Sequence, residues 1–222
     1  EIASCLVGSE MCIRDSLYLH PLIAIAAMLA IVFVMDLPHM HKPKQQLSQT
    51  IRIPAGQRAQ MDLPDGSIVW LNSQTTLTYD ENFGKKDRKV TLDGEAYFEV
   101  AHNKEIPFYV QTENIKVQVT GTKFDVCSYK GSNSFIARLI EGSINLLTNN
   151  AKEEKPITSL TKGKYFSMEN GKYKTGEMSS NNALAWMQGI YYFDDVPFKE
   201  LLDKIALYYN CLLYTSDAAD DK

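Results

Sequence analysis

The stretch RKVTLDGEAYFEV, Arg88–Val100, decides how this chain folds, and IKVQVTGTKFDVCSY, Ile115–Tyr129, continues its pattern. Apolar and polar residues alternate at a period of two in parts of both stretches, as in KVQV and FDVCSY. That alternation is typical of strands with one buried face. Similar short stretches include SIVWLNS, FYVQT, SFIARLI and SINLLT. We therefore expect strands, and no long helix, between Ile51 and Thr148.

Turn signals separate these stretches, and they are Asp65-Gly66, Asp93-Gly94, Lys130-Gly131, Glu141-Gly142 and Asn170-Gly171. Asp-Gly and Asn-Gly favour tight hairpins because both central positions accept a positive φ. Strands at a spacing of about ten residues with such turns favour an antiparallel sandwich over a parallel α/β sheet. The sequence predicts a mainly β fold, with an antiparallel β-sandwich-like domain over residues 50–174.

The composition is that of a folded protein, with 45% hydrophobic and 23% charged residues. A net charge of -4 implies no basic face, so we expect no nucleic-acid partner. The cysteines, Cys5, Cys12, Cys127 and Cys211, fit no zinc spacing. We expect no metal and no cofactor.

A hydrophobic span, Leu17–Met35, carries no Asp, Glu, Lys or Arg. Its length is close to the roughly 20 residues that cross a bilayer core. A signal peptide is the alternative, but no A-x-A cleavage site follows Met35. We favour one uncleaved transmembrane helix, followed by a juxtamembrane linker over residues 36–49. The histidines in His39–Lys42 are more simply explained by a solvated linker than by a metal site.

The two ends of the sequence look foreign to the rest. Residues 1–16 show no periodicity, and residues 211–222 break off a helical pattern. Both resemble translated sequencing-adapter read-through, and a native tail at each end is the alternative. We leave both ends out of the fold prediction.

The segment before residue 211 differs in character from the β domain. Residues 175–189 are expected to be a linker, and Ile190–Phe193 a short strand. Pro197 then opens a helix with apolar residues at helical spacing, such as Phe198, Leu201 and Ile205. Residues 190–210 are thus predicted to begin a small, truncated α+β domain.

No catalytic set stands out, so we expect that the protein is not an enzyme. The carboxylates Asp65, Asp93, Glu95 and Glu99 are better explained by turns and strands than by a glycosidase pair. His102 has no evident nucleophile partner. Trp70 and Trp186 could stack on sugars, although an aromatic residue in an alternating strand usually belongs to a core.

Several short motifs occur in a specific order between Thr50 and Thr148. They are Pro54 with Gly56, LPDGS at Leu63–Ser67, Leu71-Asn72, LDGEAYFEV at Leu92–Val100, Pro107-Phe108, GTKFDV at Gly121–Val126 and Glu141-Gly142. In this order they resemble the periplasmic domain of FecR-type proteins. The segment with Phe193, Pro197, Phe198, Leu202 and Tyr209 is similar to the start of the small C-terminal domain of FecR-type proteins from Bacteroidetes.

The matching residues are expected to serve the fold. Glycines would allow turns, and Gly121 would allow a bulge or a close strand approach. Phe98 and Phe124 would fill the inner face. The full set of expected fold-motif residues is Gly56, Asp65, Gly66, Asn72, Gly94, Phe98, Gly121, Phe124 and Gly142.

The resemblance also implies a function, that of a single-pass anti-sigma regulator in the bacterial inner membrane with most of the chain in the periplasm. Its partners would be an ECF-type sigma factor, bound through a cytoplasmic segment missing here, and the signalling domain of an outer-membrane TonB-dependent transducer. Tyr191, Tyr192 and Phe193 are possible partner-binding residues, through β-augmentation of their expected strand. The alternative is a periplasmic ligand- or glycan-binding sensor module.

Overall fold

The computed structural model describes residues 24–31, 33, 47–149, 154–178, 181–192 and 198–209. The chain divides into two compact units, Glu1–Gln45 and Gln46–Lys222. The predicted span Leu17–Met35 is described only at residues 24–31 and 33, which are helical. Among the described residues, no helix is both long and apolar enough to cross a membrane. The ends predicted to be foreign and the His39–Lys42 cluster lie outside the described residues.

The described part of the second unit consists mostly of short strands. They are β1 (Ser48–Arg52), β2 (Ala59–Asp62), β3 (Ile68–Leu71), β4 (Thr76–Asp80), β5 (Arg88–Glu99), β6 (Phe108–Gln111), β7 (Ile115–Val119), β8 (Lys123–Ser128), β9 (Ser134–Glu141), β10 (Ser143–Thr148), β11 (Pro156–Thr161), β12 (Lys164–Glu169) and β13 (Lys172–Glu177). Two helices follow, the 3-10 helix η1 (Asn181–Gln188) and the α-helix α2 (Phe198–Tyr209). We call residues 47–178 the β body, and residues 181–192 with α2 the C-terminal arm.

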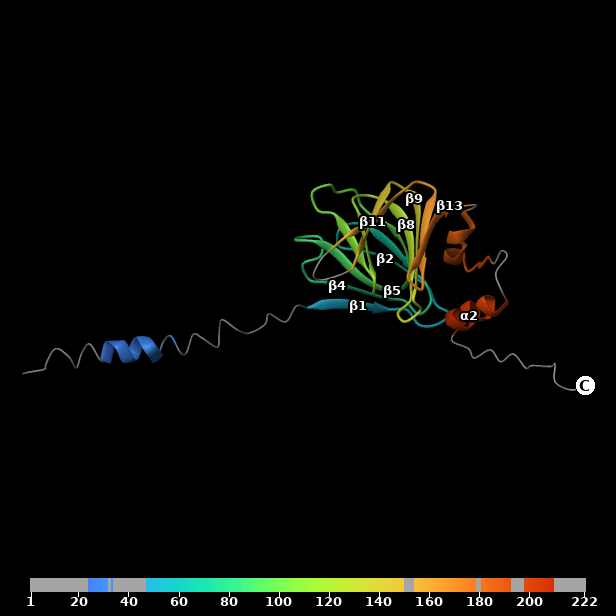
Figure 1. The fold of residues 1–222 in the computed structure, drawn as a ribbon. Helices are drawn as coiled ribbons and strands as arrows, with labels where there is room; N and C mark the ends of the chain where they lie inside the picture. Colours follow the sequence, from blue (N-terminus) through green and yellow to red (C-terminus); the bar gives the residue numbers. More distant parts are fainter. Residues whose placement is uncertain are drawn as a thin grey trace, which may run out of the picture. The chain divides into compact units, whose positions relative to one another are not determined.

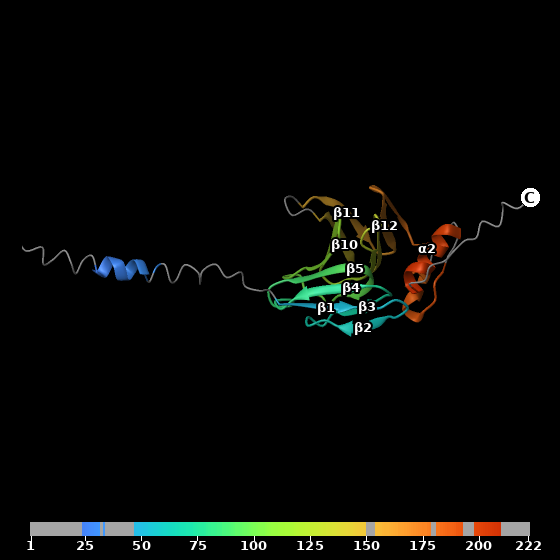
Figure 2. The ribbon, with the colours of Figure 1, turned by 90° about the horizontal axis from the view of Figure 1, so that it is seen from below.

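The strands form two layers that share β5 (Figure 1). One layer has the order β1-β4-β5-β6-β7-β10-β11, and the other has the order β2-β3-β5-β8-β9-β12-β13. In Figure 2 the early strands β1 to β4 lie on one side of the β body and β10 to β12 on the other. Among the described strand pairs, β5 and β6 run parallel and the others antiparallel. The mainly β, sandwich-like prediction is confirmed.

The long strand β5 corrects one sequence prediction. Asp93-Gly94 was expected to form a hairpin turn between two strands, but β5 runs straight through it. The first half of β5 pairs with β4 and β6, and the second half pairs with β3 and β8. Gly94 has a φ of 128°, and a Cβ placed on it would lie 2.7 Å from Thr75 Cα. The glycine is therefore needed where one strand passes from one layer to the other.

Gly142 has a similar place at the end of β9. The turn that it opens leads from β9, in the layer of β8, to β10, in the layer of β7. Its φ is 93°, and a Cβ there would lie 3.2 Å from Thr122 Cα. The expected hairpins do form at Gly66, Gly131 and Gly171, which connect β2 to β3, β8 to β9 and β12 to β13.

The core lies between the two layers and is rich in aromatic residues. Phe98, Phe108 and Phe124 are fully buried. The rings of Phe98 and Phe124 stack at 5.1 Å between centroids, and Phe108 meets Phe98 edge-on at 5.9 Å. Burying such rings contributes about 2–3 kcal/mol each. Phe98 and Phe124 thus lie in the core of the β body.

The C-terminal arm differs in part from its prediction. Ile190–Tyr192 have no strand pairing, and Phe193 lies outside the described residues, so the described part of the expected strand is absent. The helix predicted after Pro197 is present as α2. The β body ends at β13, whose last residue is Glu177, past the predicted boundary at 174.

Candidate functional site beneath the C-terminal arm

The expected fold-motif residues are spread over the β body. Asp65 and Gly66 form the β2–β3 turn, where Asp65 accepts hydrogen bonds from the backbone N–H and the hydroxyl of Ser67 at 3.0 Å and 2.8 Å. Gly121 packs against His102, and a Cβ on it would lie 2.8 Å from His102 Cα. These residues serve local geometry. Gly56 and Asn72 are different, because both touch the C-terminal arm.

Arg88 organises the end of the β body that carries the Asp65 turn. Its side chain is 2% exposed, and its Nη1 lies 3.2 Å from Asp65 Oδ2. The guanidinium also donates to the carbonyl oxygens of Ala101 at 2.7 Å, Asn103 at 3.1 Å and Ile106 at 2.7 Å. Because each of the three guanidinium nitrogens donates to the protein itself, Arg88 holds the connection between β5 and β6 in place.

A second buried ionic cluster lies under the arm. Glu95 on β5 and Asp125 on β8 are 4% and 0% exposed. Arg138 on β9 donates to Asp125 Oδ2 at 2.6 Å and lies 3.7 Å from Glu95 Oε1. Asn72 Nδ2 donates to Glu95 Oε2 at 2.6 Å. One guanidinium thus serves two carboxyl groups in a site with little access to water.

The crowding of acids shows in their pKa values. Burial raises the pKa of Glu95 from an ordinary 4.5 to about 7, and the Asp125 carboxylate adds to the rise. Arg138 and the hydrogen bonds from Asn72 and Tyr208 act in the opposite direction. Burial also raises the pKa of Asp125, against the effect of Arg138. The cluster therefore holds a proton near neutral pH that a solvated pair of acids would have lost.

Two tyrosines of the arm cover this cluster. The rings of Tyr191 and Tyr208 stack at 4.2 Å between centroids. The Tyr208 hydroxyl donates to Glu95 Oε2 at 3.4 Å, and the Tyr191 hydroxyl donates to Asn72 Oδ1 at 3.1 Å. Tyr208 thus contacts the buried Glu95 directly, and Tyr191 contacts it through the side-chain amide of Asn72.

The β body also caps the end of α2. The last carbonyl groups of an α-helix have no partner within the helix. Here the Tyr208 carbonyl oxygen accepts from the Gly56 N–H at 2.7 Å and from the Ser73 hydroxyl at 2.5 Å. Gly56 has a φ of 71°, which turns its N–H toward the helix end. This cap fixes the last turn of α2 above Glu95.

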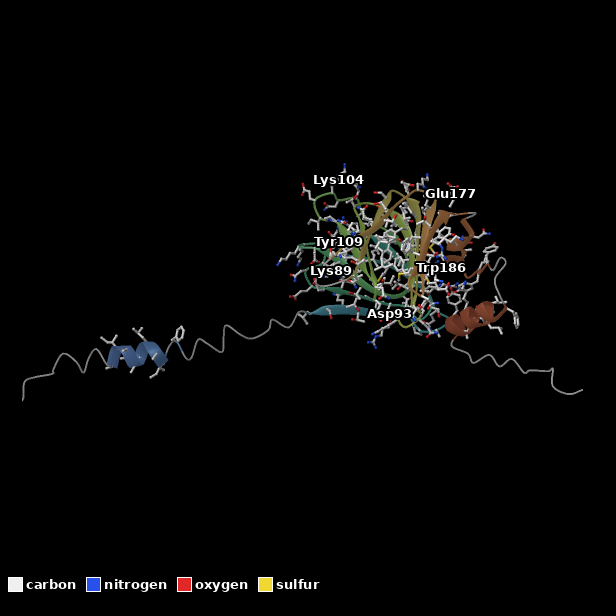
Figure 3. The ribbon with its side chains drawn as sticks, viewed as in Figure 1. Lys89, Asp93, Lys104, Tyr109, Glu177 and Trp186 are labelled. Atoms are coloured by element: carbon white, nitrogen blue, oxygen red, sulfur yellow. The ribbon has the colours of Figure 1, made fainter. Side chains whose placement is uncertain are left out.

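Trp186 anchors the first part of the arm. Its side chain is 3% exposed, and Figure 3 shows it on the side of the β body that carries the C-terminal helices, away from Lys89 and Lys104. Arg58 donates to the Trp186 carbonyl oxygen at 2.8 Å. The indole Nε1 and Asp125 Oδ1 are both buried without a hydrogen bond of full geometry to any described residue. The Trp186 side chain also acts to lower the pKa of Asp125, against the larger effect of burial.

The possible partner-binding residues have different surroundings. Tyr191 is occupied by Asn72 and by the stack on Tyr208. Tyr192 is 58% exposed and remains available for contact. Phe193 lies outside the described residues.

The catalytic candidates do not come together. Among the described residues, Asp93 accepts from the Lys130 N–H at 2.8 Å and Glu99 pairs with Lys123 at 3.4 Å. His102 lies at the Gly121 contact. No group of acids, histidines or cysteines among the described residues is arranged to hold a metal ion. Glu95 and Asp125 are too deeply covered to meet a substrate while the arm is docked.

The two tryptophans that could stack on sugars, Trp70 and Trp186, differ in their exposure. Trp186 is buried, which removes it as a platform. Trp70 is half-buried, and its ring lies 5.5 Å from that of Tyr97 in a tilted arrangement. It lines a cavity of about 230 Å³ together with Arg58 and Trp186.

Comparisons with known proteins agree with this architecture. Residues 49–145 match the family described as FecR protein. Two crystal structures of a candidate anti-sigma factor from Parabacteroides distasonis, at 2.50 Å and 1.65 Å resolution, are similar at 26% sequence identity and a TM-score of 0.66. The first covers 74% of this chain and 76% of that one, and the second covers 73% and 75%. No curated protein matches the chain.

Proposed function

Since this chain carries a FecR domain at residues 49–145, we propose that it regulates sigma-factor signalling as a membrane-anchored anti-sigma factor. The observation that carries the proposal is the likeness, over 74% of the chain, to a candidate anti-sigma factor of known structure. Anti-sigma factors act by binding and not by catalysis. The dispersal of the catalytic candidates over the β body supports that class.

The proposed arrangement places the helix Leu17–Met35 in the inner membrane and the β body with its arm in the periplasm. A cytoplasmic segment ahead of the helix would hold an ECF-type sigma factor. The signalling domain of a TonB-dependent outer-membrane transducer would bind in the periplasm and change the state of the sigma complex. Such a relay requires that the transducer bind two states of the regulator with different affinity.

The exposed part of the arm is the proposed contact for the transducer. Tyr192 is 58% exposed, and Ile190 beside it is 46% exposed. An exposed tyrosine next to an aliphatic side chain is common at the centre of protein interfaces. Tyr191 supports this surface from beneath through its stack on Tyr208.

The test is a binding titration of the full chain, in detergent, with the signalling domain of its cognate transducer. We expect saturable binding, which Tyr192→Ser weakens by about tenfold or more. Tyr173→Ser is the matched control, since Tyr173 is 71% exposed on β13 and should leave affinity unchanged. Absence of binding would favour the periplasmic ligand-sensor alternative, which retains only Trp70 as a half-exposed sugar platform.

A further inference from the structure

Two buried carboxyl groups beneath the C-terminal arm, those of Glu95 and Asp125, share the single guanidinium group of Arg138. Asp125 holds Arg138 at 2.6 Å, whereas Glu95 lies 3.7 Å from the same Nη1. The shorter contact stabilises the charge on Asp125 more, since the interaction energy of two charges falls with distance. Glu95 is therefore the member of the pair that carries the proton.

We propose that the C-terminal arm is a proton-dependent latch, which stays docked on the β body while Glu95 is protonated and loosens when Glu95 ionises. The latch deepens the proposed function and rests on it in one respect, since a relay needs two states of the regulator. The docked and released arms would be those two states.

Titratable groups face Glu95 from each element packed around it. On β8 and just after it lie Asp125, Cys127 and Tyr129, on β9 lies Arg138, and on the arm lie Tyr191 and Tyr208, with Lys204 acting on Cys127. Burial raises the pKa of Cys127 and of the three tyrosines, so these groups stay neutral at physiological pH. The charge that changes near neutral pH is that of Glu95.

Ionised Glu95 opposes the docked arm for two reasons. The arm removes water from the carboxylate, and burial is the largest cause of the rise in its pKa. The last turn of α2 also lies over Glu95, and the carbonyl end of a helix carries a partial negative charge that disfavours a nearby anion. The Tyr208 hydroxyl favours the ionised form, but its bond of 3.4 Å is long.

The direction of the pH effect follows from the two states of Glu95. Well below its ordinary pKa of 4.5 the carboxyl is protonated whether the arm is docked or released. The pKa of the released state lies below that of the docked state, because water returns to the carboxyl. Between that lower pKa and about 7 the docked state keeps a proton that the released state loses. Docking therefore weakens as the pH rises through this window, and the loss is complete above it.

Trp186 provides a measure of docking, because it lies in the arm, its side chain is 3% exposed and its carbonyl oxygen accepts from Arg58 of the β body. The sequence has two tryptophans, so Trp70→Phe leaves Trp186 as the only indole. We would measure acrylamide quenching of this full-length variant between about pH 5 and about pH 8. Quenching should rise severalfold with pH, with a midpoint at or below about 7.

Three substitutions in the Trp70→Phe background make the test specific. Glu95→Gln is neutral at every pH and should keep quenching low throughout. Glu99→Gln is the matched control on the same strand and should titrate like its parent. Tyr208→Phe removes one bond that stabilises the docked, ionised form, so the arm should be released at the same pH as in the parent or at a lower one.

Flat quenching in the parent, or a Glu95→Gln variant that titrates like the parent, would overturn the latch. If Glu95→Gln fails to fold, the parent and Tyr208→Phe decide the question, because release of Tyr208→Phe at a higher pH than the parent would also contradict the latch. The measurement involves no sigma factor or transducer. Failure of the latch is therefore distinguishable from failure of the proposed function.

Discussion

Replacing Arg88 by Met should destabilise the β body more than the loss of any exposed ion pair. Arg88 is 2% exposed, and its guanidinium serves one carboxylate and three backbone carbonyl groups. The substitution keeps much of the apolar stem but leaves the Asp65 carboxylate, 5% exposed, without its cation. Removing one partner of a buried pair costs about 3–5 kcal/mol, and the stranded carbonyl groups place this site at about 4 kcal/mol or more.

Urea denaturation followed by circular dichroism measures this loss. With a typical m-value, 4 kcal/mol lowers the midpoint by roughly 2 M. Arg88→Lys should recover part of the loss, since an ammonium group restores the charge but not the fork of donors. Lys123→Met is the control, because the side chains of its pair with Glu99 are 44% and 32% exposed and such pairs contribute at most about 1 kcal/mol. If Arg88→Met cost no more than Lys123→Met, the assignment of Arg88 as an organising residue would be wrong.

Further measurements test the fold and the buried acid. Gly94→Ala should lower the free energy of unfolding by about 3 kcal/mol in urea melts, because backbone strain and the contact with Thr75 add together. Gly131→Ala is the control and should lower it by about 1 kcal/mol, because Gly131 has a φ of 79° but open space around it. Phe124→Ala should cost about 3–5 kcal/mol by the same assay, and a loss under about 1 kcal/mol would contradict its place in the core. The free energy of unfolding should fall by at most about 3 kcal/mol as the pH rises from 4.5 to about 7, because Glu95 with the arm docked keeps a proton that it loses on unfolding; melts of Glu95→Gln should lack this component.

Local sequence signals were sufficient for the strands and hairpins that depend on near neighbours. β7 follows its alternation, and the turns at Gly66 and Gly171 follow their dipeptides. Asp93-Gly94 carries the same local signal but lies within β5, because the partners of its two halves are in different layers. A dipeptide contains no information about those partners. The strand β2, with the sequence AQMD, alternates over only four residues, which is too short a run to stand out.

The cluster beneath the arm was hidden from sequence analysis for a similar reason. Asp125 stands at the polar phase of the FDVCSY alternation, which predicts a solvent-facing side chain. It is buried nevertheless, in contact with Arg138 on β9 and influenced by Trp186, far along the chain. The sequence predicted Trp186 as a possible sugar platform or a core residue, and it predicted residues 175–189 to be a linker. Arg138 and Tyr208 had no separate signal, since an arginine in a strand and a tyrosine in an amphipathic helix are common.

The most direct test of the account is the effect of this gene on transcription. In the organism that carries it, an anti-sigma regulator restrains one alternative sigma factor. Deleting the gene should therefore raise the transcripts of a single set of genes that share one promoter element, and restoring the gene should lower them again. Transcript levels unchanged by deletion and by restoration would contradict the proposed function.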